Sequence, residues 1–137
     1  PGVAAVSART WQHGPMTRLF VYGTLRARGS QHHRLAGARA LGPARTRPEL
    51  TLLDLGWHPA LVQRGHTAVV GELYEVDAAL LAALDEFEGV PAWYQRVPLV
   101  LEDGVEVETY VMRDADAGPR PEIDGGDWIT YAQARDG

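Results

Sequence analysis

The chain has 137 residues, of which 45% are hydrophobic, with 15 glycines and a formal net charge of −5 at pH 7. This length suits a single domain with a substantial core, and the composition is that of a globular protein. The negative charge argues against nucleic acid and membrane surfaces as partners, because affinity for phosphate groups comes from clustered cations. Residues 1–17 lack the apolar core of a signal peptide and no apolar run is long enough to span a membrane, so we expect a cytoplasmic protein.

Missing residue types limit the chemistry further. The chain has no Cys, which excludes disulfides, thiolate nucleophiles and thiolate metal sites. All 13 basic residues are Arg, and the absence of Lys excludes Schiff-base chemistry and a P-loop. The only serines, Ser7 and Ser30, lie outside any G-x-S-x-G motif. Carboxylates, the five histidines and the tyrosines remain as proton carriers.

The order of apolar runs and turn residues predicts one domain after a loose start. Residues 1–16 show no sustained period, and we interpret them as an extension or a remnant of expression that precedes a domain over 17–137. Residues 18–25 predict a short strand that ends at a glycine, and 26–37 predict a loop with one helical turn. Residues 38–77 alternate strand-like runs with turn residues, which favours an antiparallel sheet or a small barrel.

The clearest element is a helix predicted over 78–88. Asp77 is a suitable N-cap for this helix, and Gly89 is placed to end it. The strand-like runs that follow, 94–103 and 105–113, are joined by an Asp-Gly pair, which is a strong hairpin signal.

The last turn of the predicted helix holds three acidic residues, Asp85, Glu86 and Glu88, although the partial negative charge of a helix end disfavours them. At about 100° per residue, Glu88 projects onto the core-facing side with Leu84, Glu86 points to solvent and Asp85 lies at the margin. Burial and the helix dipole should then raise the pKa of Glu88, as a general acid or base near neutral pH requires. The alternative is a frayed last turn in which Glu88 forms a salt bridge with Arg96.

The stretch FVYGTL, residues 20–25, ends the first predicted strand at Gly23. Such an ending leaves the backbone N–H groups of Gly23, Thr24 and Leu25 free to point at one spot, which makes a cradle for an anion or oxyanion. Most strand-Gly-Thr sequences are ordinary turns, so an ordinary turn is the competing interpretation.

Several other residues have structural interpretations. His32 and His33 are adjacent and point apart in most backbones, which disfavours a metal pair. Residues 114–118 predict a flexible acidic loop, and 127–137 predict a short closing helix. We expect His13, His58 and His66 at solvated or core-edge positions. Four aromatic residues can either line a pocket or pack in the core, and core packing is the favoured interpretation: Trp57, Trp93, Trp128 and Tyr131.

Three motifs occur in order over residues 18–131: VYGTLRARG near the start, LDEFEGVPAWYQR around residue 90, and GDWITY near the end. Together they resemble the gamma-glutamyl cyclotransferase-like family, which includes gamma-glutamylamine cyclotransferase and the AIG2-like proteins. The resemblance implies an α+β fold, with a small mixed, largely antiparallel β-barrel and flanking helices. It also implies that Glu88, in the D-x-x-E-G motif, is the catalytic acid/base. The implied substrate-binding residues are Tyr22, Gly23, Thr24, Leu25 and Tyr94.

The reaction implied by this resemblance needs no metal, nucleotide or covalent intermediate. The α-amine of the substrate attacks its own γ-carbonyl, which forms 5-oxoproline and releases the attached amine, while Glu88 moves the proton. The implied partner is a small gamma-glutamyl molecule, and the protein would act as a monomer or homodimer. YGTL and YQR favour a gamma-glutamylamine, and a gamma-glutamyl-protected biosynthetic intermediate fits the same chemistry. The alternative is a non-catalytic metabolite-binding or stress-response protein that retains the barrel.

Overall fold

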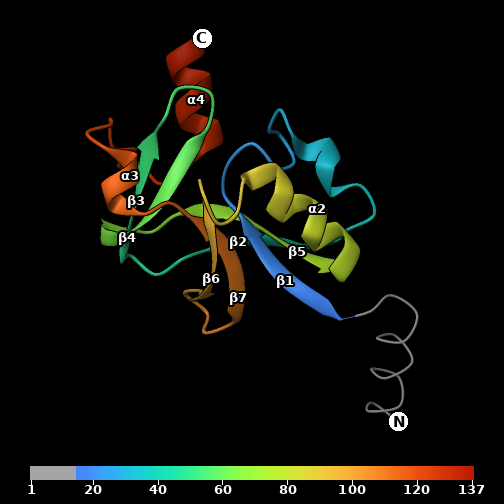
Figure 1. Cartoon of the computed structure of the whole chain (residues 1–137). Coiled ribbons are helices and arrows are strands. Elements are labelled where there is room, and N and C mark those ends of the chain that lie inside the picture. The colour runs from blue at the N-terminus through green and yellow to red at the C-terminus, as the bar shows by residue number, and fades with distance from the viewer. Residues whose placement is uncertain (1–14) are drawn as a thin grey trace.

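The computed structural model describes residues 15–137, so the N-terminal extension expected over 1–16 lies almost wholly outside the described residues. The first described strand already begins at Met16. Figure 1 shows the elements in chain order. They are β1 (Met16–Val21), η1 (His32–Leu35), β2 (Arg39–Arg45), β3 (Leu50–Asp54), β4 (Pro59–Thr67), β5 (Val70–Asp77), α2 (Ala78–Glu88), β6 (Gln95–Val100), β7 (Glu106–Val111), α3 (Asp114–Ala117) and α4 (Trp128–Asp136).

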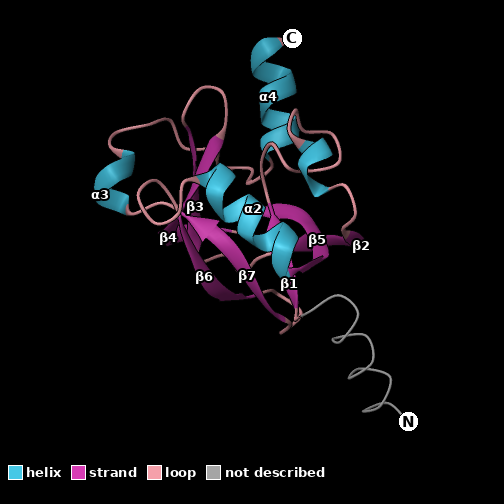
Figure 2. Ribbon diagram, turned by 45° about the vertical axis from the view of Figure 1, so that its right-hand side comes forward, coloured by secondary structure: helices cyan, strands magenta, loops and turns pink. Residues whose placement is uncertain are grey.

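The strands form a five-stranded sheet in the order β2-β5-β1-β7-β6, and β3 and β4 form a separate hairpin. Only the β1 and β7 pairing is parallel, so the expected α+β fold with a largely antiparallel, mixed sheet is confirmed. The described strands do not close into the expected barrel. The edge strands β2 and β6 meet only beyond their ends, at an isolated bridge between Thr46 and Leu101, while β3 and β4 pair with each other. Figure 2 shows α2 lying in front of the strands.

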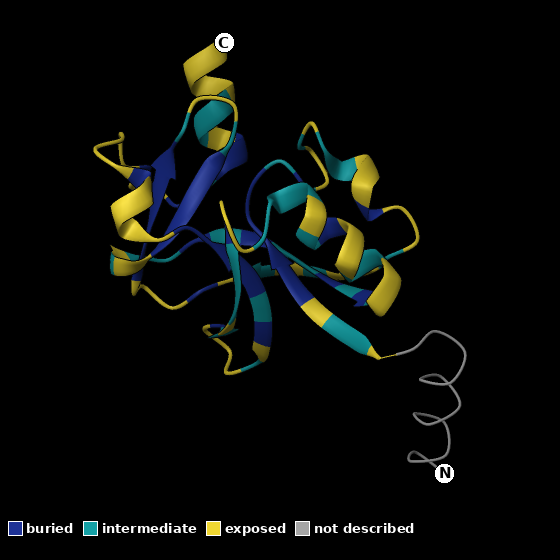
Figure 3. Cartoon of the chain, viewed as in Figure 1, coloured by how far each residue is buried: buried dark blue, intermediate teal, exposed yellow. Residues whose placement is uncertain are grey.

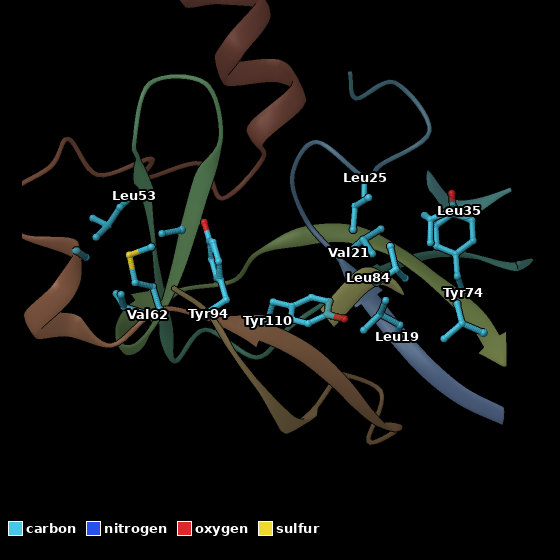
Figure 4. Packing of buried hydrophobic residues seen from close by; sticks show 14 residues of the cluster. Leu19, Val21, Leu25, Leu35, Leu53, Val62, Tyr74, Leu84, Tyr94 and Tyr110 are labelled. Carbon is cyan, nitrogen blue, oxygen red and sulfur yellow. The ribbon is translucent and has the colours of Figure 1, made fainter. Parts of the chain in front are cut away.

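The central strand β1 is covered on both faces, which explains its uninterrupted apolar run. Leu19, Phe20 and Val21 are buried, and because side chains alternate along a strand they enter two different clusters. Leu19 and Val21 pack with Leu84 of α2, as Figure 4 shows. Phe20 instead packs in the cluster that contains Trp128 of α4. Helix α2 therefore packs in the cluster on one face of β1, and α4 packs in the cluster on the other face.

Helix α2 has the bounds that the sequence predicts. The Asp77 carboxylate accepts a hydrogen bond from the Leu80 amide at 2.8 Å, and Gly89 ends the helix in the left-handed region with φ of 70°. Leu84 is the buried residue of this helix, and the opposite side is exposed in Figure 3. The caps and the buried Leu84 therefore fix the position of the last helical turn relative to the core.

The C-terminal part is partly as expected. Helix α4 confirms the closing helix, and its N-cap Asp127 accepts from the Thr130 amide at 3.2 Å. The flexible acidic loop expected over 114–118 is wrong, because Asp114–Ala117 form the short helix α3, in which Ala117 is buried. No helix among residues 15–137 is long and apolar enough to cross a membrane.

Candidate active site

The loop after β1 leaves a row of amides unused. The Arg26 amide donates to the Gly23 carbonyl at 3.1 Å, and the Gln31 amide donates to the Thr24 carbonyl at 2.8 Å. Within the described residues, no group accepts a hydrogen bond from the amides of Gly23, Thr24 or Leu25. Consecutive free amides at the end of a strand can bind an anion or a developing oxyanion.

Ion pairs hold this loop in place. The Arg26 guanidinium contacts Glu72 of β5 at 2.7 Å and Asp127, the N-cap of α4, at 2.9 Å. The Ala27 amide donates to the second Glu72 oxygen at 2.7 Å. Since all three contacts join residues far apart in the sequence, the free amides are fixed relative to the sheet before any ligand binds.

The three acids in the last turn of α2 have three different environments. Asp85 pairs with Arg96 at 3.0 Å and accepts from the Tyr110 hydroxyl at 2.7 Å. Glu86 is exposed to solvent. Arg96 also binds Glu108, and among the described residues no ion pair joins Arg96 to Glu88, so the salt bridge between these two residues that the sequence left open is wrong. Within residues 15–137, Asp85 therefore forms an ion pair at the helix end, and Glu88 does not.

Glu88 is half-buried, and no described residue donates a hydrogen bond to its carboxylate. Burial raises the pKa of this group from 4.5 to about 7, while the positive charge of Arg34 acts in the opposite direction. A carboxyl group with a pKa near 7 can both accept and return a proton at neutral pH.

Two tyrosines stand beside this carboxylate. Tyr22 donates its hydroxyl proton to the Tyr110 carbonyl at 2.7 Å, and Tyr94 donates to the Pro59 carbonyl at 2.9 Å. Burial raises the pKa of both phenols, and the negative charge of Glu88 raises it further. Both tyrosines therefore stay protonated, with their hydroxyl groups turned to backbone carbonyls. Figure 4 shows Tyr94 beside the β3–β4 hairpin and Tyr110 between it and α2.

These parts surround one cavity of about 810 Å³. It lies between the loop after β1, the end of α2 and the β3–β4 hairpin. All six residues singled out from the sequence line it: Tyr22, Gly23, Thr24, Leu25, Glu88 and Tyr94. The structure thus brings the free amides and the carboxylate with the raised pKa to the same space.

Sequence reasoning missed His58 and Arg120 among the residues around this cavity, and for Trp57 and Trp93 it gave pocket lining only as the second interpretation. Core packing was the wrong expectation for Trp57 and Trp93, which are 91% and 71% exposed at the cavity rim. It is right for Trp128, which is buried. A usable signal for Trp57 was its place after a glycine in a hairpin turn, where a large side chain cannot reach a core.

Tyr131 confirms the expected core packing only in part, and His58 lies at the edge of the core, as expected. Tyr131 packs only partly against the core and donates its hydroxyl proton to Asp54 at 2.6 Å. His58 is half-buried, and its Nδ1 lies 3.0 Å from the Tyr94 hydroxyl oxygen. No three His, Asp or Glu side chains among residues 15–137 come together as a metal-binding group.

An α+β fold whose pocket joins a carboxylate of raised pKa to free backbone amides has the groups that acid–base chemistry on a small molecule uses. A family model described as gamma-glutamyl cyclotransferase, AIG2-like, matches residues 19–130. The chain therefore belongs to the gamma-glutamyl cyclotransferase, AIG2-like family, as the three sequence motifs indicate.

Individual relatives agree with this family. The chain is 41% identical over 115 residues to a putative gamma-glutamylcyclotransferase of Vibrio cholerae, a match that covers 80% of this chain and 93% of that protein. It is 41% identical over 120 residues to the gamma-glutamylaminecyclotransferase of Bos taurus, covering 77% of this chain and 70% of that protein. The crystal structure of an AIG2-like protein from Mus musculus has a TM-score of 0.68 and 30% identity, over 80% of this chain and 86% of that one.

Proposed function

We propose that this enzyme converts a gamma-glutamyl amine into 5-oxoproline and the free amine, with Glu88 as the group that carries the proton. The observation that supports this most is the position of Glu88, whose pKa is raised to about 7, on the same cavity as the free amides of Gly23, Thr24 and Leu25. Acyl transfer needs both a base and a site for the oxyanion, and this cavity offers both.

The reaction balances without any further group. The α-nitrogen of the substrate forms a bond to the γ-carbonyl carbon, and the bond from that carbon to the amine nitrogen breaks. The attacking α-ammonium loses two protons as it becomes the lactam N–H, and Glu88 transfers them one after the other to the leaving nitrogen, which departs as an ammonium ion. Because both reacting groups belong to one molecule, the enzyme mainly has to hold the substrate folded, and such orientation can contribute about 7 to 11 kcal/mol.

The other lining residues then bind rather than react. The amides of Gly23, Thr24 and Leu25 hold the oxyanion or the α-carboxylate of the substrate. Tyr22 and Tyr94 offer ring surfaces to the cavity, because their hydroxyl groups already donate to backbone carbonyls. Their raised pKa values exclude them as bases near pH 7.

The direct test is incubation of the purified protein with a series of gamma-glutamyl amines, followed by quantification of 5-oxoproline, free amine and glutamate. We expect 5-oxoproline and amine in equal amounts. Release of glutamate would show hydrolysis by water, and absence of turnover across the series would contradict the proposed activity.

The pH dependence of the reaction follows from the pKa of Glu88. The carboxylate form accepts the proton, so activity should be high above pH 7 and should fall as the pH decreases through about 7. Below that value, kcat/KM should fall about tenfold for each pH unit. The measurement is kcat/KM over a range of about pH 5 to 9. A profile that stays flat down to pH 5 would exclude a base with this pKa.

Removal of Arg34 should move this profile to higher pH. Its guanidinium lies 3.9 Å from the centroid of the Phe87 ring, and its charge lowers the pKa of Glu88. In Arg34→Gln, the pKa of Glu88 should rise, so the acid limb of kcat/KM should shift upward while the rate at high pH stays unchanged. Arg28→Gln removes an equal charge from the exposed neighbouring loop and is the control. Equal profiles for both variants would contradict the assigned role of Arg34.

A further inference from the structure

The outer rim of the cavity carries an unusual concentration of exposed apolar surface. Among residues 15–137, the large hydrophobic side chains that are exposed are Leu41, Trp57 and Trp93. Two of these three line the cavity that contains Glu88. A tryptophan that is 91% exposed, as Trp57 is, contributes nothing to the core, and exposed aromatic side chains beside a pocket mark a ligand-binding surface.

Trp57 sits on an anchored turn at the tip of the β3–β4 hairpin. The Asp54 carboxylate accepts from the Gly56 amide at 2.7 Å and from Arg135 at 2.9 Å. Arg135 also donates to the Gly56 carbonyl at 2.7 Å, and Tyr131 donates to the second Asp54 oxygen. Figure 1 shows this hairpin tip beside α4, which supplies Arg135 and Tyr131. The turn is therefore held on α4 while it presents Trp57 to the cavity.

Trp93 is held from the other side, directly after α2. Its amide donates to the Gly89 carbonyl at 2.8 Å. A Cβ atom on Gly89 would lie 2.7 Å from Cδ1 of the Trp93 ring, so the ring packs against the residue that follows Glu88. The Trp93 ring and the backbone turn that carries Trp57 are therefore held near the proposed proton carrier by contacts within the chain.

The charges around the rim disfavour a cationic ligand group. Besides Glu88, the only carboxylate among the described lining residues is Asp116, and it pairs with Arg113 at 2.9 Å. Arg120 adds a positive charge to the lining. An ammonium group at the rim would find no unpaired carboxylate and would gain only a cation–π contact with a tryptophan, whereas a flat neutral ring can stack on the same face without desolvation of a charge.

We propose that Trp57 and Trp93 form the subsite for the leaving amine and that this subsite selects amines that carry a neutral aromatic ring. This inference rests on the proposed function, because it assigns the part of the substrate that leaves as the free amine. The gamma-glutamyl group occupies the inner cavity beside Glu88 and the 23–25 amides. The aromatic substituent extends outward between the hairpin tip and the end of α2.

The test uses the full chain and compares three substrates. They are gamma-glutamyl-benzylamine, gamma-glutamyl-propylamine and a cationic derivative, a diaminopentane in which only one of the two amines carries a gamma-glutamyl group. We expect kcat/KM for the benzylamine derivative to exceed that for the propylamine derivative by about tenfold or more, as stacking on aromatic side chains allows. The cationic derivative should be the poorest of the three. A preference for the cationic derivative, or equal values for all three, would overturn the proposal.

Variants then assign the preference to the two rings. Trp57→Ala and Trp93→Ala should each lower the benzylamine-to-propylamine ratio of kcat/KM several-fold, and the corresponding Phe variants should restore most of it. Leu41→Ala is the matched control, because Leu41 is the third exposed apolar residue and does not line the cavity. Its ratio should equal that of the wild type. An unchanged ratio in both Trp→Ala variants would overturn the proposal.

The anchor on α4 gives an independent measurement. Arg135 lies outside the cavity lining, and its hydrogen bonds to Asp54 and Gly56 position the turn that carries Trp57. Arg135→Gln should lower the same substrate ratio, which a general loss of stability would leave unchanged. Failure of the proposed function is distinguishable throughout: no 5-oxoproline from any of the three substrates would contradict the activity itself, whereas turnover without the aromatic preference contradicts only this subsite.

Discussion

Glu88→Gln should lower kcat for cyclisation at least about a hundredfold, because general acid–base catalysis contributes about a hundred- to ten-thousandfold. The glutamine keeps the size and hydrogen-bonding reach of the side chain but cannot accept and return a proton near pH 7. The measurement is the rate of 5-oxoproline release at saturating substrate, on a gamma-glutamyl amine that the wild type cyclises.

Glu86→Gln is the matched control for this substitution. It makes the same chemical change two residues away, on a side chain that is exposed to solvent. Its kcat should stay near that of the wild type, since both variants remove one negative charge from the same helix turn and only one removes the proposed base. If both variants cyclise the substrate equally well, Glu88 is not the proton carrier.

Glu88→Gln should also stabilise the fold at neutral pH. A carboxyl group whose pKa rises on folding, here from 4.5 to about 7, makes ionisation unfavourable in the folded state. The wild type should therefore be most stable below pH 4.5 with respect to this group, and it loses that stability as the pH rises to about 7. At about 1.4 kcal/mol per pKa unit, the gain in Glu88→Gln above pH 7 has an upper limit of about 3 kcal/mol. Thermal unfolding of the wild type and of Glu88→Gln, each at about pH 5 and about pH 8, measures this gain in stability.

Gly29→Ala should lower kcat/KM about ten- to a hundredfold, since small misplacements of binding groups have effects of this size. A Cβ atom at this position would lie 2.2 Å from the Thr24 carbonyl oxygen, so the loop that carries the free amides would have to move. The Thr24 carbonyl already accepts from the Gln31 amide, and that contact would be lost or lengthened.

Gly125→Ala provides the control for the glycine substitution. Nothing lies within 4 Å of its added Cβ, and its backbone is outside the left-handed region. Both variants should be folded by circular dichroism, and only Gly29→Ala should lose activity. Equal activity in the two variants would contradict the role assigned to the amides of Gly23, Thr24 and Leu25.

The local features of this chain could be predicted from sequence because they depend on neighbouring residues. An apolar stripe at helical spacing, an N-cap at Asp77 and a stop at Gly89 define α2 and also the direction of Glu88. The Asp103-Gly104 turn depends on local backbone preferences, with φ of 89° at Gly104. Gly23 is instead required by a distant contact, because an added Cβ would lie 2.7 Å from the Pro59 ring. The family resemblance then joined two local patterns, Glu88 and the 23–25 loop, that neither periodicity nor spacing could connect.

The remaining features depend on contacts between distant parts of the chain. Asp85 is stabilised by Arg96 and Tyr110, which come from β6 and β7, so its partner could not be assigned from helix position alone. Trp57 and Trp93 belong to separate loops that meet only after the hairpin and α2 have packed on the sheet. Hydrophobicity favours a core position for a tryptophan, and although the hairpin turn indicates exposure for Trp57, only the tertiary structure places both tryptophans at the rim of one cavity.

The measurement that tests this account most directly is the pKa of the Glu88 carboxyl group in the free protein. Carbon-13 labelling of glutamate side chains and NMR titration, with Glu88→Gln used to assign the resonance, give this value without any substrate. We expect a midpoint of about 7, coincident with the acid limb of kcat/KM. A midpoint near 4.5, the ordinary value for a solvated glutamate, would contradict the claim that burial prepares Glu88 to carry the proton.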